Sequence, residues 1–170
     1  MSRGKVLTHE YLLEILDFNQ EIGKFYWKIY RKNNVRVGAE AGSIIKSPRK
    51  RTPHRMLEID NKSYLLHRLA WFYVNKKWPE GQIDHIDKNG LNNSTKNLRE
   101  ATNAQNRANT DGKSKLGFLK GTHRQTNGRY QARIQANGKQ KALGTFDTMQ
   151  EAHEAYCKAA TELFGDFASF

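Results

Sequence analysis

Alternating apolar and polar residues predict an antiparallel sheet in the last third of the chain. Three short runs within residues 117–146 are separated by Asn127-Gly128 and Asn137-Gly138, and Asn-Gly between alternating runs is typical of a β-hairpin. The middle run has two alternating sets, with Tyr130, Ala132 and Ile134 in one and Arg129, Gln131, Arg133 and Gln135 in the other. We therefore expect three strands with one apolar face and one basic, amide-rich face.

The third run predicts a strand with the same two faces, followed by a helix. Its apolar set is Ala142, Gly144 and Phe146, and its polar set is Lys139, Lys141 and Thr145, with Leu143 interrupting the basic face. Residues 148–151 form a capping box, and small or apolar residues then recur at helical spacing up to a C-cap at Gly165. This helix is expected to cover the apolar face and to leave the basic face open.

The middle of the chain predicts a strand, a turn-rich loop, a second strand and a helix over residues 83–109, with a capping box at residues 102–105 that opens the helix. Such a unit can bring Asp84 and His85 on the first strand close to Asn106 on the helix. Neighbouring residues on a regular strand point to opposite faces. Asp84 and His85 can therefore share a site only if the strand ends or bulges there.

Shorter patterns predict a small sheet in the N-terminal part. Residues 8–18 have the spacing of an amphipathic helix, residues 25–30 alternate as a strand, and Asp60-Asn61 suggests a hairpin. Residues 46–55 form a basic loop punctuated by proline, which fits either a DNA backbone contact or a solvated charge run.

The charge narrows the class of partner. A net charge of +12 on 170 residues points to a polyanion, with nucleic acid ahead of a membrane surface. Residues 111–145 carry +7 and residues 146–170 carry −4, so the predicted sheet is basic and the predicted helix acidic.

There is no run of roughly 20 apolar residues and no signal-like apolar stretch, so we expect a cytoplasmic protein that is not secreted and has no membrane partner. A single Cys cannot supply a multi-thiolate site, so no structural zinc is expected.

Asp84, His85 and Asn106 are residue types that suit metal-assisted phosphodiester hydrolysis. Carboxylate and amide oxygens are hard donors that prefer Mg²⁺ or Mn²⁺, and two protein ligands leave room for water and phosphate oxygens. A neutral imidazole can take a proton from water as a general base. Taken alone, Asp-His also occurs in ordinary turns. Asparagine clusters are usually loop formers, an interpretation that applies to Asn89, Asn92, Asn93 and Asn103.

This constellation resembles the HNH endonucleases, or ββα-metal nucleases, in the homing and phage branch whose last His is an Asn. The resemblance spans about residues 55–110 and rests on HRLAW, the Asp-His pair, NLREAT and QNRAN. It implies that Asp84 and Asn106 bind one Mg²⁺ or Mn²⁺ ion, that His85 activates water, and that Asn97 braces the loop so that His85 points correctly. It also implies cleavage of DNA to 5′-phosphate and 3′-hydroxyl ends, by a phage or mobile element in a bacterial cytoplasm.

Four further side chains near the motif are candidate contacts to phosphate or DNA: His67, Arg68, Arg99 and Arg107. Guanidinium groups bind phosphate in a bidentate manner, but each of the three arginines also fits an exposed residue without a role. His67 precedes an apolar helical run and also fits a packing or capping histidine.

The C-terminal segment, about residues 116–170, resembles the APETALA-type DNA-binding domain of plant ethylene-response factors through GRYQARI, LGTF and the helix. Lys120-Gly121-Thr122 departs from that family, which usually has Val after the Gly. In the family the sheet enters the DNA major groove, and this implies five residues that face DNA: Arg124, Arg129, Arg133, Lys139 and Lys141. The alternative is a solvated strand face.

Together the patterns predict an α+β fold, with a small N-terminal sheet and a ββα-metal nuclease core, then a three-stranded antiparallel sheet packed on one helix. The expected domains are residues 1–109, with the nuclease core at about 64–109, and residues 117–170, joined by a linker at 110–116. The expected function is a metal-dependent endonuclease for double-stranded DNA. The alternative is a catalytically inactive DNA-binding regulator or architectural protein. RNA binding fits less well, because the strands lack an RNP-like aromatic motif.

Overall fold

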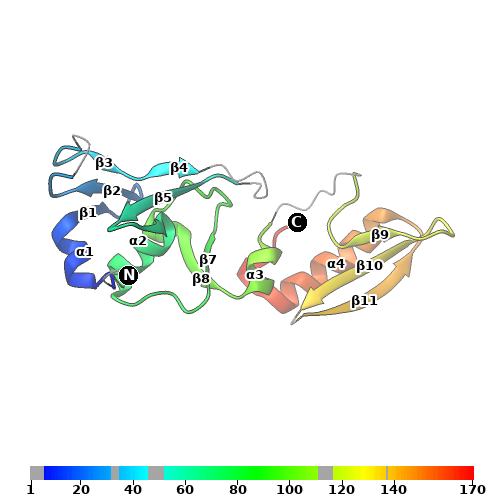
Figure 1. The fold of residues 1–170 in the computed structure, drawn as a ribbon. Helices are drawn as coiled ribbons and strands as arrows, with labels where there is room; N and C mark the ends of the chain where they lie inside the picture. Colours follow the sequence, from blue (N-terminus) through cyan, green and yellow to red (C-terminus); the bar gives the residue numbers. More distant parts are fainter. Residues whose placement is uncertain (1–5, 32–34, 46–51, 111–116, 137) are drawn as a thin grey trace. The chain divides into compact units, whose positions relative to one another are not determined.

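The computed structural model describes residues 6–31, 35–45, 52–110, 117–136 and 138–170, and in these residues it has a mixed α/β fold with several small sheets and four α-helices (Figure 1). The chain divides into two compact units, Met1–Glu100 and Ala101–Phe170. The basic loop at 46–55, the linker at 110–116 and the turn at Asn137 lie wholly or partly outside the described residues. None of the helices in the described ranges has the length and apolar character needed to cross a membrane.

Among its described residues, the first unit has three small sheets and two α-helices. One antiparallel sheet has the order β1-β2-β3 and another the order β4-β5-β6, while β7 pairs with β8. The bounds are α1 (His9–Ile15), β1 (Leu16–Asn19), β2 (Lys24–Trp27), β3 (Glu40–Ala41), β4 (Ser43–Ile45), β5 (His54–Ile59), β6 (Lys62–Leu65), α2 (Leu66–Asn75), β7 (Gln82–His85), the 3-10 turn η1 (Thr95–Asn97) and β8 (Leu98–Ala101).

The first helix is shorter than the sequence pattern predicts. Thr8 caps α1 by accepting a hydrogen bond from the Tyr11 amide, but the chain leaves the helix after Ile15, so the predicted extension to residue 18 is wrong. Leu16 and Phe18 are buried and alternate with exposed neighbours in β1, which has the period of a strand. The apolar residues therefore fit both the helical and the strand period, and the pairing of this segment with β2 makes it a strand.

The core of the first unit forms where α2 packs against α1 and the first sheet. Leu66, Leu69 and Phe72 of α2 are at most 5% exposed, and they share one apolar cluster with Leu12 and Phe25. Burial of such side chains stabilises a fold by about 1.5–3 kcal/mol each. This core holds the start of α2 beside the start of β5.

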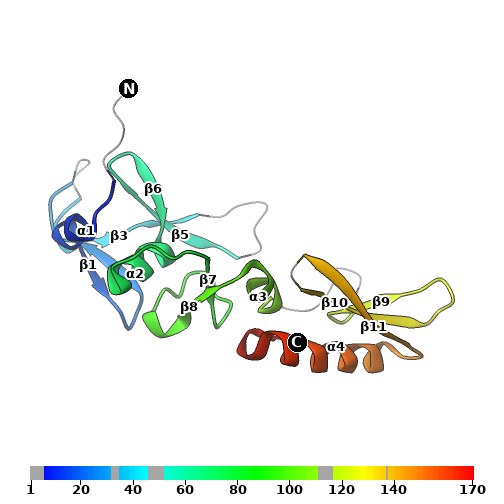
Figure 2. The ribbon, with the colours of Figure 1, turned by 90° about the horizontal axis from the view of Figure 1, so that it is seen from below.

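The second unit is a three-stranded antiparallel sheet, in the order β11-β10-β9, with α4 along one face (Figure 2). The bounds are α3 (Asn103–Ala108), β9 (Thr122–Arg124), β10 (Tyr130–Ala136), β11 (Lys139–Phe146), α4 (Met149–Phe164) and the 3-10 turn η2 (Gly165–Phe167). The predicted capping boxes are present at Thr102 and Thr148, and Gly165 is the C-cap of α4.

A β-bulge changes which residues of the sheet share a face. Ala132 pairs with Gly144, but Arg133 pairs with Ala142, so Leu143 is an extra residue in β11. Leu143 packs beside Ile134 in the apolar cluster under α4, and Ala142 is exposed. The prediction that Ala142 faces the helix and Leu143 interrupts the basic face is therefore wrong, because a bulge reverses the alternation.

The same register separates the five basic residues that were expected to face DNA together. Directly opposite residues of an antiparallel pair point to one face. Lys139, Lys141 and Arg124 lie opposite Ala136, Ile134 and Tyr130, on the face that α4 covers. Arg133 lies on the other, open face, and Arg129 continues its alternation. The expectation of one shared basic face is therefore wrong, and the open face has a smaller set of cations.

The helix α3 belongs to the second compact unit. Lys120 Nζ donates to the carbonyl oxygens of Ala108, Thr110 and Ser169 at 2.6, 2.8 and 2.9 Å. These bonds tie the end of α3 to the last residues of the chain. The two units divide at Glu100 and Ala101, ahead of the predicted linker.

Candidate active site

The Asp-His pair lies at the end of β7, where both side chains are buried. β7 ends at His85, so the regular alternation that would separate the two side chains stops there. Asp84 and His85 are 4% and 7% exposed. Asp84 Oδ2 accepts a hydrogen bond from Arg99 Nε at 2.9 Å, whereas His85 Nε2 lies 3.0 Å from Asn93 Oδ1. Each of the two side chains is thus held by a partner of its own.

Asn97 joins the two sides of the β7–β8 loop. Its Nδ2 donates to Asp87 Oδ1 and to the Asn92 carbonyl, both at 2.8 Å, and its Oδ1 accepts from the Asp87 amide at 2.9 Å. The Ile86 amide also donates to the Asn97 carbonyl at 2.9 Å. These contacts brace the backbone that follows His85, and a role of Asn97 in orienting His85 for catalysis stays a prediction.

Asp87 is the charged centre of this loop. Desolvation alone would raise the pKa of the Asp87 carboxyl, but hydrogen bonds from Asn92, Asn89 and Asn97 outweigh it and hold this pKa below its usual value. The ionised carboxylate is the form that accepts these bonds. Asn89 and Asn92 therefore act as loop formers, as the sequence predicts.

This pKa shift predicts a pH-dependent contribution to stability. Because folding lowers the pKa, ionised Asp87 stabilises the fold above its unfolded value of about 4, and the contribution is lost as pH falls through the lower folded value. The difference in Tm between the wild type and Asp87→Asn should stay constant from about pH 8 to about pH 5 and shrink below about pH 4. Thermal unfolding across this range measures it, and a pH-independent difference would contradict the assignment.

Asn93 is completely buried, and the β1–β2 turn packs against its backbone. Its exposed fraction is 0%. The Thr95 amide and hydroxyl both donate to the Gln20 carbonyl, at 2.9 and 3.0 Å. A Cβ on Gly23 would lie 2.2 Å from the Asn93 carbonyl carbon. The turn therefore packs directly on the backbone of the residue that contacts His85. Asn93 thus lies in the loop, as the sequence predicts, and its side chain also contacts His85.

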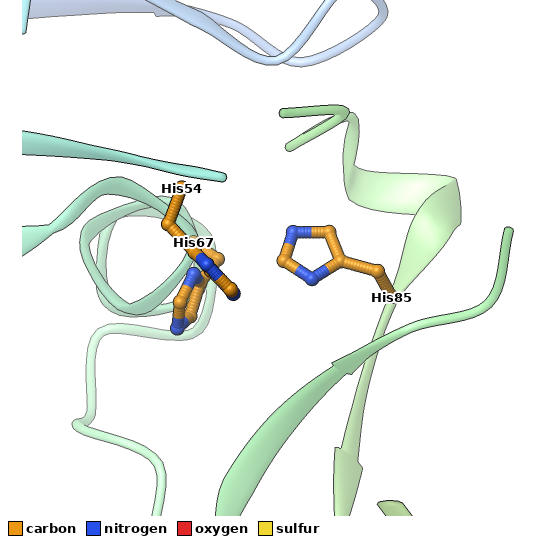
Figure 3. Close-up of side chains that lie close together, drawn as sticks. All are labelled: His54, His67 and His85. Atoms are coloured by element: carbon orange, nitrogen blue, oxygen red, sulfur yellow. The ribbon is translucent and has the colours of Figure 1, made fainter. Parts of the chain in front are cut away.

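Three histidines from separate elements meet at the end of β7. His54 begins β5, His67 lies in the first turn of α2, and the His85 ring points toward both (Figure 3). Their ring centroids are 5.2–5.9 Å apart. His67 is 6% exposed, which fits the packing interpretation, and a contact of His67 with phosphate or DNA stays a prediction.

His54 was missed by sequence reasoning, although the hairpin register contains a signal for it. Met56 pairs with Leu65 and Ile59 with Lys62. Extending this register by two residues places His54 opposite His67. The hairpin at Asp60-Asn61 was predicted, so the pairing could have been read from it.

Two of the three candidate arginines near the motif have structural partners in the protein. Arg68 donates to the carbonyl oxygens of Gly81 and Pro79 at 2.9 and 3.1 Å, and so braces the segment before β7. Arg99 pairs with Asp84 and has an 18% exposed side chain. Arg107 is exposed on α3. A role for these residues in binding phosphate stays a prediction.

The two predicted metal ligands, Asp84 and Asn106, have oxygen donors that suit a hard divalent cation. Asp84 offers a buried carboxylate, whose Oδ2 pairs with Arg99, and Asn106 offers a half-buried amide on α3. Carboxylate and amide oxygens suit Mg²⁺ or Mn²⁺. Asn106 belongs to the second compact unit and Asp84 to the first. The convergence of Asp84, His85 and Asn106 therefore remains a prediction.

Comparisons with known proteins agree with the motif. Residues 64–108 match the family model described as HNH endonuclease, a segment that does not include the C-terminal sheet. An uncharacterized HNH endonuclease of Acanthamoeba polyphaga mimivirus is 37% identical over 106 residues, which cover 61% of this chain and 55% of that protein. This chain thus spans about half the length of that relative. No solved structure matches the chain. Residues 64–108, with the Asp84-His85 pair at the end of β7, are therefore similar to the HNH endonuclease domain.

Proposed function

We propose that this chain is a divalent-metal-dependent endonuclease that hydrolyses phosphodiester bonds of double-stranded DNA to 5′-phosphate and 3′-hydroxyl ends. The observation that carries the proposal is the buried Asp84-His85 pair at the end of β7, within the segment that matches the HNH endonucleases. The viral relative fits a viral or mobile element as the source of the chain. A cytoplasmic location belongs to the same proposal.

His85 is the general base in this proposal. Asn93 Oδ1 lies 3.0 Å from His85 Nε2 and can only accept a hydrogen bond. In the neutral ring the proton is therefore on Nε2, and Nδ1 has the lone pair that takes a proton from water. Asn93 selects this tautomer, and Asn97 holds the backbone beyond His85.

Asp84 and Asn106 are the proposed ligands of the metal ion. A bound Mg²⁺ or Mn²⁺ ion would stabilise the negative charge that develops on the phosphate and on the leaving 3′ oxygen. Arg99 orients the Asp84 carboxylate through its Nε and offsets the charge of that carboxylate when it is buried. Asn106 is presented by a helix whose start is fixed by the Thr102 capping box.

The C-terminal unit is proposed to bind DNA in the manner of an APETALA-type domain. The support is a sheet covered on one face by α4 and the basic residues Arg129 and Arg133 on the open side. Arg129 Nε also pairs with Asp147 at 2.8 Å. Such exposed pairs contribute little to stability, so Arg129 can exchange the carboxylate for a phosphate at small cost.

Plasmid digestion tests the enzymatic part of the proposal. Purified protein with Mg²⁺ or Mn²⁺ should convert supercoiled plasmid into nicked or linear DNA, and EDTA should stop the reaction. Mapping of the ends should give 5′-phosphate and 3′-hydroxyl. Tight DNA binding without cleavage, across several metals and sequences, would instead favour the inactive DNA-binding regulator.

Arg133→Ala tests the open face of the sheet. Loss of one phosphate contact should lower the slope of log K against log salt concentration by about 0.9. Lys141→Ala is the matched control, because it removes one charge from the same sheet on the face that α4 covers. Fluorescence anisotropy with a DNA duplex at several salt concentrations measures both slopes. An equal or larger change in Lys141→Ala would contradict binding through the open face.

A further inference from the structure

Three histidines bring their ring nitrogens together at the end of β7. The proposed nuclease chemistry uses His85 alone and does not use this arrangement of three nitrogen donors. His54, His67 and His85 each offer a ring nitrogen, and these three atoms all lie within 4.8 Å of one another. Two nitrogens bound at tetrahedral angles to one ion, each about 2.1 Å from it, are about 3.4 Å apart. Nitrogens that lie within 4.8 Å of one another need to approach by about 1.4 Å at most to reach that spacing.

The outer contacts of two of these rings are those of metal-binding histidines. A ligating histidine usually donates its other ring N–H to a carbonyl or carboxylate oxygen, which fixes the tautomer. His54 Nδ1 lies 3.0 Å from the Thr52 carbonyl, and His85 Nε2 lies 3.0 Å from Asn93 Oδ1. Both oxygens can only accept. The neutral rings therefore have their lone pairs on His54 Nε2 and His85 Nδ1.

We propose that His54, His67 and His85 form a site for one transition-metal ion of the Zn²⁺ class, distinct from the Mg²⁺ ligands Asp84 and Asn106. Three imidazoles prefer Zn²⁺, Co²⁺, Ni²⁺ or Cu²⁺ to the hard cations Mg²⁺ and Ca²⁺. Two of the rings are more than 90% buried, and His54 is half-buried, so the site is held within the fold and is reached from the side of His54.

The packing around His54 supports a site whose ligands are held in place by the fold. A Cβ on Gly90 would lie 2.5 Å from the Pro53 carbonyl oxygen and 3.2 Å from His54 Nε2. The β7–β8 loop thus packs against the start of β5 only because residue 90 lacks a side chain. This contact holds His54 beside His85, although the two residues are 31 positions apart in the sequence.

Occupation of this site would affect cleavage. The ion would take the Nδ1 lone pair of His85, and His85 could then no longer accept a proton from water. Zn²⁺ should therefore inhibit Mg²⁺-dependent cutting. This consequence rests on the proposed function of His85, whereas binding of the ion does not.

Titration of the full chain with Co²⁺ alone tests the site without any measurement of activity. The visible absorption of protein-bound Co²⁺ should rise and saturate at one ion per chain, and added Zn²⁺ should abolish it. His54→Ala should weaken binding at least about tenfold, as should His67→Gln. His9→Ala is the matched control, because His9 is also a half-buried histidine bonded to a backbone oxygen, that of Tyr73, and it should bind Co²⁺ as the wild type does.

The outcomes separate the two proposals. Equal Co²⁺ binding by the wild type and His54→Ala, or no saturable binding by the wild type, would overturn the site. If the site exists and the chain is a nuclease, Zn²⁺ should inhibit Mg²⁺-dependent cleavage by the wild type, and His54→Ala should need at least about tenfold more Zn²⁺ for the same inhibition. Saturable Co²⁺ binding by a chain that does not cut DNA would support the site and count against the proposed function.

Discussion

Replacing His85 by alanine is expected to lower the rate of DNA cleavage by about 10²- to 10⁴-fold, the usual contribution of a general base. DNA binding should change by less than about twofold, because affinity comes mainly from cations that contact phosphates. Single-turnover cleavage with protein in excess measures the chemical step, and anisotropy measures binding. Added imidazole should restore part of the lost rate, because a small base can occupy the space of the missing ring.

The stability of this variant has to be separated from its chemistry. His85→Ala removes the partner of the fully buried Asn93, and loss of such a partner costs about 1–3 kcal/mol. His9→Ala likewise removes an imidazole bonded to an oxygen atom elsewhere in the same unit, so it serves as the matched control. It should keep cleavage within about twofold of the wild type. A comparable loss of rate in both variants, or no rescue by imidazole, would argue against His85 as the base.

Gly23→Ala is expected to destabilise the first unit by about 3 kcal/mol or more, which corresponds to a decrease in Tm of roughly 12 to 24 °C. The new Cβ would meet the backbone of Asn93 and Ser94 at 2.2 and 2.3 Å, so the β7–β8 loop has to move. Gly23 also has φ +67°, a conformation that is strained for alanine. Because the displaced backbone carries Asn93, cleavage should fall even at temperatures where the variant is folded.

Gly38→Ala is the matched control for this prediction. Gly38 also has a positive φ, +81°, but a Cβ there would meet nothing within 4 Å. It should therefore show only the conformational cost of about 1 kcal/mol. The difference between the two variants isolates the close approach of the β1–β2 turn to Asn93. Equal decreases in Tm would show that this approach does not matter for stability.

Local chemistry was enough to predict much of this protein. Side chains that cap a helix act on backbone groups two or three residues away, so Thr8, Thr102 and Thr148 identify helix starts from the sequence alone. The hairpin at Asp60-Asn61 and the segment around Asp84-His85 were recognised for the same reason. Each of these signals lies within a short stretch of chain.

Features that depend on non-local contacts were not predictable in this way. Leu16 fits both a helical and a strand period, and it becomes a strand residue because β2 pairs with it. The alternation in β11 predicted Leu143 on the basic face, and the bulge opposite β10 reverses that assignment. Sequence periodicity assumes an uninterrupted element, whereas pairing with a neighbouring strand determines where the element changes.

The amino-acid pattern alone established the chemical motif at the end of β7, the elements around it and the basic character of the C-terminal unit, because each depends on residues close together in the chain. The tertiary structure determined which residues surround His85. Gly23 supports Asn93, Asn93 orients the imidazole, and His54 and His67 lie beside it. These partners come from distant segments whose proximity results from packing around the α2 core, and no local rule specifies such a contact.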